Sequence, residues 1–158
     1  MTFAITISST ARATVVYWVV ECYKNSIIYR YRGEQSTEEL PQYEILGLSD
    51  GYIETVRDIA PELVAVTYEN QNGDIIYFDY SFMYQGTQTY FVLNDDDVLD
   101  VMVNQMDGKF IESHIPGKLN CLTWIVPDLN IQFSIERCFD FDSVLHMAES
   151  VSLCKVLK

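Results

Sequence analysis

The chain has 158 residues, of which 49% are hydrophobic and 13% aromatic, and its formal net charge is −13. This length suits one domain with a substantial hydrophobic core, and the composition excludes wholesale disorder. So acidic a chain lacks the Lys/Arg surface that nucleic-acid phosphates and anionic membranes attract, so we expect neither as a partner.

The first strong pattern along the chain is a pair of strands over 14–23 and 26–32, rich in Val, Tyr and Ile and separated by Lys24-Asn25. This arrangement predicts a hairpin. The polar, acidic stretch 33–44 predicts a loop. Next, Ile53, Val56 and Ile59 recur at helical spacing, which predicts a short helix over 52–60 that Pro61 ends.

Two further strands are predicted over 63–69 and 74–82, because Asn72-Gly73 between them is a strong hairpin-turn signal. Gln85-Gly86 marks another turn, and a strand over 89–93 follows it.

A second helix is predicted from about Asp95 to Met106. Asn94 is a good N-cap residue, and acidic side chains in a first turn complement the positive end of the helix. Apolar residues then follow at helical spacing: Val98, Leu99, Met102, Val103 and Met106.

The last part of the chain predicts strands over 119–126 and 131–137 and a third helix near 141–155, capped by Asp140 or Asp142. The fold class that follows is α+β: a single domain with a mixed sheet of five to seven strands and two or three helices.

The aspartates near the predicted second helix are the main functional candidates. Helix capping explains one or two of them, whereas four side chains repel one another: Asp95, Asp96, Asp97 and Asp100. They are either a solvated helix start or a docking face for basic side chains. The spacing and glycine of a calcium-binding EF-hand loop are missing, so we expect no metal there and no other cofactor.

The densest basic cluster is formed by Lys24, Arg30 and Arg32. Arg30 and Arg32 would share one face of a strand. They are either ordinary solvent-facing positions or a basic patch that meets an acidic surface of another molecule.

The four cysteines, Cys22, Cys121, Cys138 and Cys154, show no zinc-type spacing. We see no secretory leader, and the apolar run 15–20 is too short to cross a bilayer. We therefore expect reduced, mostly buried thiols in an intracellular protein of the cytoplasm or nucleus.

His114 and His146 lie in no catalytic motif, so we expect no enzyme. A catalytic alternative would need the fold to join a Cys and a His.

Residues 14–126 resemble a ubiquitin-like β-grasp domain of the Phox-and-Bem type, as found at the N-termini of plant Mutator-like transposases. The likeness rests on 76–80, Gly86, 90–102 and the strand near 119–126. It implies a β-grasp-like core over 14–126 with a C-terminal strand and helix extension over 127–158. In that family an acidic segment of one copy engages a basic strand cluster of another, which implies Asp95, Asp96, Asp97 and Asp100 as the acidic side.

The sequence therefore predicts a non-catalytic protein-interaction module whose acidic helix start docks a protein with a basic surface, possibly another copy of itself. An alternative is an acidic inhibitor, such as an immunity protein or a DNA mimic, that blocks a basic active site or nucleic-acid-binding surface. The net charge and acids spread along the chain favour that alternative.

Overall fold

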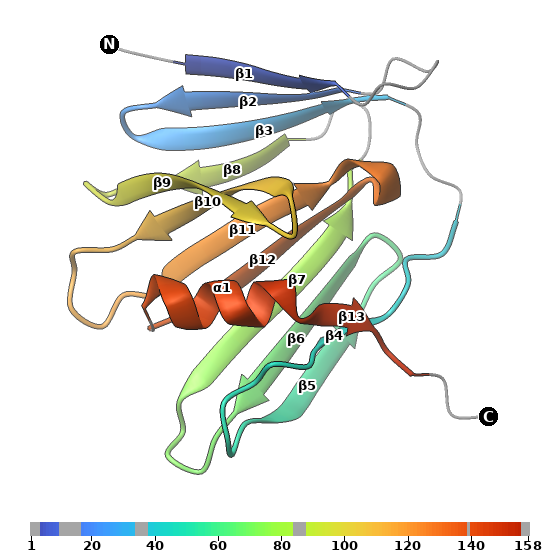
Figure 1. Cartoon of the computed structure of the whole chain (residues 1–158), viewed down its shortest axis with the longest axis vertical. Coiled ribbons are helices and arrows are strands. Elements are labelled where there is room, and N and C mark those ends of the chain that lie inside the picture. The colour runs from blue at the N-terminus through green and yellow to red at the C-terminus, as the bar shows by residue number, and fades with distance from the viewer. Residues whose placement is uncertain (1–3, 10–16, 34–37, 84–87, 139, 156–158) are drawn as a thin grey trace.

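The computed structural model describes residues 4–9, 17–33, 38–83, 88–138 and 140–155. The chain folds into two antiparallel sheets, with one short helix lying against the larger sheet (Figure 1). A third, two-stranded sheet pairs β4 (Tyr43–Ile45) with β13 (Val151–Leu153). Both strands of this pair lie on the same face of the large sheet as the helix.

The small sheet has four strands in the order β1-β2-β3-β8. Its strands are β1 (Ala4–Ser9), β2 (Tyr17–Tyr23), β3 (Ser26–Arg32) and β8 (Gln88–Val92). The predicted hairpin is confirmed over 17–32 as β2 and β3, while residues 14–16 lie outside the described residues. The predicted strand over 89–93 is confirmed as β8. β8 pairs with β3 and so joins this sheet to the middle of the chain.

The large sheet has seven strands in the order β5-β6-β7-β12-β11-β10-β9. Its strands are β5 (Ile53–Ile59), β6 (Leu63–Glu69), β7 (Ile75–Phe82), β9 (Asp97–Val103), β10 (Met106–Glu112), β11 (Asn120–Val126) and β12 (Ile131–Arg137). A 3-10 turn, Pro127–Leu129, links β11 to β12. The predicted strands over 63–69, 74–82, 119–126 and 131–137 are confirmed.

The predicted α+β class is wrong, because the fold is mostly β and resembles no two- or three-helix β-grasp. Residues 95–106, expected to be a helix, form β9 and the turn into β10. Asn104 and Gln105 take positive φ values of 48° and 71°, which suits a tight hairpin turn and no helix. The apolar residues of β9 lie on both faces of the sheet, and this two-sided distribution produced the helix-like spacing, although only Val103 among them is buried.

Residues 52–60, also expected to be a helix, form the edge strand β5. Ile53, Val56 and Ile59 are exposed there and form no buried stripe. The confirmed helix is α1 (Phe141–Glu149), whose N-cap Asp140 accepts a hydrogen bond from the Ser143 backbone N–H at 3.2 Å. It ends six residues before the predicted boundary, because the chain turns at Ser150 into β13. No helix in the described parts of the chain is long and apolar enough to cross a membrane.

Two hydrophobic cores lie on opposite faces of the large sheet. On the helix face, Phe78, Trp124 and Phe133 stack with α1 and β4 above them. On the other face, the small sheet packs over β9, β10 and β11 through a second cluster: Ile27, Tyr29, Tyr31, Met83, Leu93, Ile111, Cys121 and Ile125. Strand alternation explains the division, since Cys121 and Ile125 point away from Leu122 and Trp124.

Candidate functional site: a pocket between the two sheets

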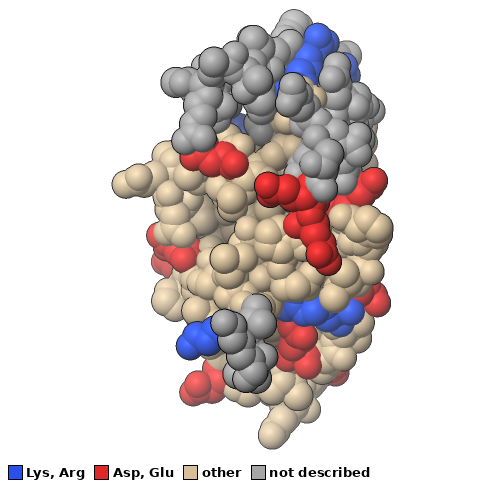
Figure 2. Space-filling view, turned by 90° about the vertical axis from the view of Figure 1, so that its right-hand side faces the viewer, with Lys and Arg blue, Asp and Glu red and all other residues tan. Residues whose placement is uncertain are grey.

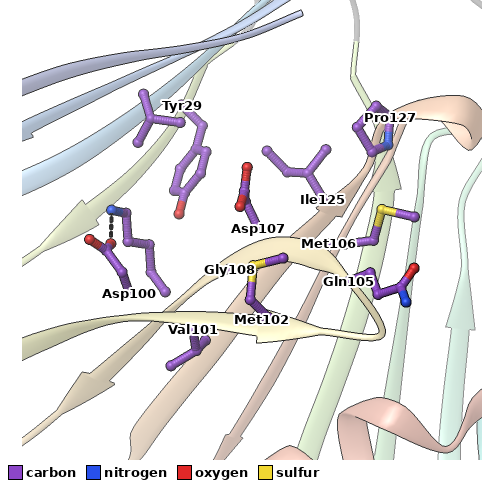
Figure 3. Close-up of a pocket in the computed structure, with 12 residues that line it drawn as sticks. Tyr29, Asp100, Val101, Met102, Gln105, Met106, Asp107, Gly108, Ile125 and Pro127 are labelled. Atoms are coloured by element: carbon purple, nitrogen blue, oxygen red, sulfur yellow. Dashed lines mark hydrogen bonds and ion pairs between the residues drawn. The ribbon is translucent and has the colours of Figure 1, made fainter. Parts of the chain in front are cut away.

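A pocket of about 430 Å³ lies where the small sheet passes over the β9–β10 hairpin (Figure 3). This volume falls within the range of small-molecule sites. β2 and β3 supply the roof through Val20 and Tyr29, which are directly opposite each other in the small sheet. The remaining lining comes from the hairpin and the end of β11: Asp100, Val101, Met102, Gln105, Met106, Asp107, Gly108, Lys109, Ile125 and Pro127.

Most of the pocket wall is apolar. Val20, Ile125 and Pro127 give aliphatic surface, and Met102 and Met106 add flexible thioether side chains that adapt to irregular shapes. Gly108 keeps the hairpin close to β11: a Cβ there would lie 2.9 Å from the Thr123 carbonyl oxygen. The geometry therefore suits the apolar body of a ligand.

Tyr29 is the buried polar group of the site. The residue is 3% exposed, and its hydroxyl has no hydrogen-bond partner among the described residues. The ring packs edge-on against Phe91, with centroids 5.9 Å apart, which fixes its direction. Figure 3 shows the hydroxyl pointing from the small sheet toward Asp100 and Asp107. Burial raises the pKa of Tyr29 far above its usual range, so the hydroxyl stays neutral and can donate a hydrogen bond.

A charged pair lies beside the Tyr29 hydroxyl. Lys109 and Asp100 are opposite each other on β10 and β9, and the Lys109 ammonium forms an ion pair with the Asp100 carboxylate. The Asp100 side chain is 84% exposed, so it lies at the pocket mouth, whereas Lys109 is mostly covered. Asp107 is exposed on the same side and adds a second carboxylate.

Among the four aspartates predicted as a docking face, Asp100 is the one that lines the pocket. Asp96 is buried and pairs with Lys118, with 3.0 Å between Oδ2 and Nζ. Asp97 lies 2.9 Å from His114 Nε2, and Asp95 is exposed in the β8–β9 loop with φ of 57°. They start a strand rather than a helix, and three of the four are paired with basic side chains of this same chain.

The predicted basic cluster is divided. Arg30 and Arg32 share the outer face near one end of β3, and Lys24 lies in the hairpin turn at its other end. Arg30 is already paired with Glu21 at 3.3 Å. The structure therefore does not bring the three basic residues together.

The cysteines and histidines lie apart from the pocket lining. All four thiols are free, but only Cys121 is buried, so the expectation of mostly buried thiols is wrong for Cys22, Cys138 and Cys154. The described residues contain no group of three or more His, Cys, Asp or Glu side chains placed to hold a metal ion.

Sequence reasoning missed Tyr29, Asp107 and Lys109 as site residues. They are far apart along the chain or lie in ordinary strand positions, so no linear motif marks them. The alternation Tyr29-Arg30-Tyr31-Arg32 was the available signal, since it predicts that Tyr29 faces inward while Arg30 faces out.

Comparison with known proteins places the chain in a family. It belongs to the family described as "Domain of unknown function (DUF4367)", whose model matches residues 42–151. The match runs from β4 to β13 and includes the strand and helix after Pro127. Strands β1, β2 and β3 precede the match, and β2 and β3 among them provide the pocket roof. Neither the curated proteins nor the solved structures gave a match.

Proposed function

We propose that this chain is a non-catalytic binding domain and that the pocket between its two sheets is the ligand site. The ligand is a small molecule with an apolar body and one hydrogen-bond acceptor. The observation that carries the proposal is the Tyr29 hydroxyl, which is buried beside the pocket and has no hydrogen-bond partner in the described part of the chain. Leaving such a group unsatisfied costs about 1–3 kcal/mol, and an acceptor on the ligand would remove that cost.

The rest of the pocket supports the same ligand chemistry. The apolar wall takes the body of the ligand, while the exposed Asp107 carboxylate favours a neutral or cationic molecule over an anion. We retain the sequence-based prediction of a non-catalytic protein, but we propose the pocket as the binding site in place of the four aspartates. Pairing with Lys118, His114 and Lys109 occupies three of the four aspartates that would otherwise act as a docking face.

Titration with Nile red, a neutral dye that fluoresces in apolar surroundings and carries a carbonyl acceptor, tests this function. Met102→Trp would fill the pocket, because Met102 lines it. Leu99→Trp on the same strand is the matched control, since Leu99 is similarly exposed but faces the other side of the sheet. We expect the unsubstituted chain and Leu99→Trp to bind the dye alike, and Met102→Trp to bind at least tenfold more weakly. Absence of dye binding, or equal binding by both variants, would refute the proposal.

A further inference from the structure

Strand β5 lies at one edge of the large sheet, with β6 as its partner on the inner side (Figure 1). On its other side no strand pairs with it in the described parts of the chain. An edge of this kind presents unpaired backbone N–H and C=O groups, and folded proteins usually protect it with charges or distortion. β5 has a bulge between Glu54 and Val56, but the rest of the strand is regular.

The exposed side chains of β5 are unusually apolar. Ile53 is 66% exposed, Ile59 63% and Val56 46%. The apolar surface continues onto the neighbouring strands through Leu63 and Tyr77. Ile53 and Val56 lie on one face of the sheet with Leu63 and Tyr77 and form an apolar strip with them along the sheet edge, which is typical of a surface that another molecule covers. Ile59 lies beside Val64 on the opposite face.

The backbone geometry shows which groups of β5 point outward. At the hairpin end, the Ala60 N–H donates to the Leu63 carbonyl at 2.9 Å, so Ala60 faces β6. Because antiparallel strands alternate between inward and outward residues, the backbone groups of Ile59 and Arg57 face the free edge. An added strand along this edge could therefore form hydrogen bonds with the backbone N–H and C=O groups of these two residues.

The charge at the edge is acidic. Arg57 is occupied by Glu54, with which it forms a 2.6 Å ion pair, and by the Tyr43 carbonyl at 3.0 Å. Asp58 and Glu62 are exposed and form no ion pair within the described residues. Figure 2 shows the side of the molecule that lies to the right in Figure 1, where acidic groups outnumber basic ones. A second copy of the chain would bring like charges together here, which disfavours self-pairing.

From these observations we infer that β5 binds an extended, basic segment of a partner protein, which adds an eighth strand to the large sheet. Apolar side chains on one face of the segment cover Ile53 and Val56, and one on its other face covers Ile59. A Lys or Arg side chain of the segment meets Asp58, and another meets Glu62 in the adjoining turn. Main-chain hydrogen bonds give affinity in such strand addition, and the charges select the partner. This surface is separate from the ligand pocket.

A labelled heptapeptide with valines placed opposite Ile53, Val56 and Ile59 and a lysine opposite Asp58 tests the inference. The same peptide with glutamate in place of lysine is its charge-reversed control. Ile59→Pro removes an outward N–H at an edge position where proline is tolerated, and Ile59→Ala removes the same side chain but keeps the N–H. We expect binding of the lysine peptide alone, a modest loss for Ile59→Ala, and a further tenfold loss for Ile59→Pro. Equal affinity of the two Ile59 variants, or of the two peptides, would overturn the inference.

Amide hydrogen exchange on the unsubstituted chain provides a second readout that needs no variant. On saturation with the lysine peptide, the Arg57 and Ile59 amides should become protected, while the Asp58 amide, which already faces β6, should change little. Protection confined to other strands, or sedimentation showing that the chain pairs with itself through β5, would also overturn the inference.

Discussion

Asp96 and Lys118 form an ion pair across the boundary between the two sheets, with Asp96 Oδ2 3.0 Å from Lys118 Nζ. Asp96 lies in the loop from β8 to β9, and Lys118 lies in the connection from β10 to β11. The Asp96 side chain is only 2% exposed, and its Oδ1 has no partner among the described residues. This ion pair therefore fixes the loop in which the chain passes from the small sheet to the large sheet.

Lys118→Met should destabilise the fold, because it leaves a buried carboxylate without its cation. We expect a loss of about 1–3 kcal/mol in the free energy of unfolding. The double variant Asp96→Asn with Lys118→Met should recover most of this loss, since no unpaired charge remains. Urea denaturation of the three chains measures both values. An unchanged midpoint for Lys118→Met would show that the pair contributes nothing to stability.

Tyr29→Phe should leave the unliganded protein at least as stable as the parent chain. The substitution removes a buried hydroxyl for which the described residues offer no hydrogen-bond partner, and it keeps the ring against Phe91. We expect a gain of about 1–3 kcal/mol in the free energy of unfolding measured with urea. If the pocket is the ligand site, Nile red should bind this variant severalfold more weakly. A clear loss of stability would instead mean that the hydroxyl is satisfied in the folded protein.

Asp79→Asn should stabilise the protein at neutral pH. Burial, and secondarily the nearby Glu136 carboxylate, raises the pKa of Asp79 from 3.8 to about 6. Because the folded pKa lies above the unfolded one, ionised Asp79 costs stability that is absent below about pH 4, grows as pH rises to about 6, and is complete above it. The difference corresponds to about 3 kcal/mol as an upper value.

The check is a pair of unfolding curves measured from pH 4 to pH 8. The stability difference between Asp79→Asn and the parent chain should widen through this interval, because only the parent chain carries an ionisable group at position 79. A constant difference for Asp79→Asn across the whole range would contradict the raised pKa.

Gly108→Ala should destabilise the hairpin that forms the pocket floor. The added Cβ would lie 2.9 Å from the Thr123 carbonyl oxygen and 3.1 Å from the Trp124 Cβ, and the first of these neighbours is backbone that cannot move aside. Overpacking of this kind costs about 1–3 kcal/mol. Calorimetry should show a lower melting temperature with the transition still cooperative. An unchanged melting temperature would mean that β10 can shift away from β11 freely.

The sequence determined most of the strands of this protein, because alternation and turn residues act locally. Tyr29-Arg30-Tyr31-Arg32 alternates inward and outward residues, and Asn72-Gly73 permits the positive φ that its turn requires, with Gly73 at 82°. The start of α1 was equally readable, because Asp140 caps it with its own side chain.

Only the tertiary structure decided the rest, and the physical reason is burial on both faces of one sheet. β9 lies between two cores, so its apolar residues follow no simple period of two and imitate a helix. The same packing turned Asp96 inward to Lys118, and it brought Tyr29 over a hairpin some eighty residues later in the chain. Contacts of that sequence separation leave no local pattern, and the pocket depends on them.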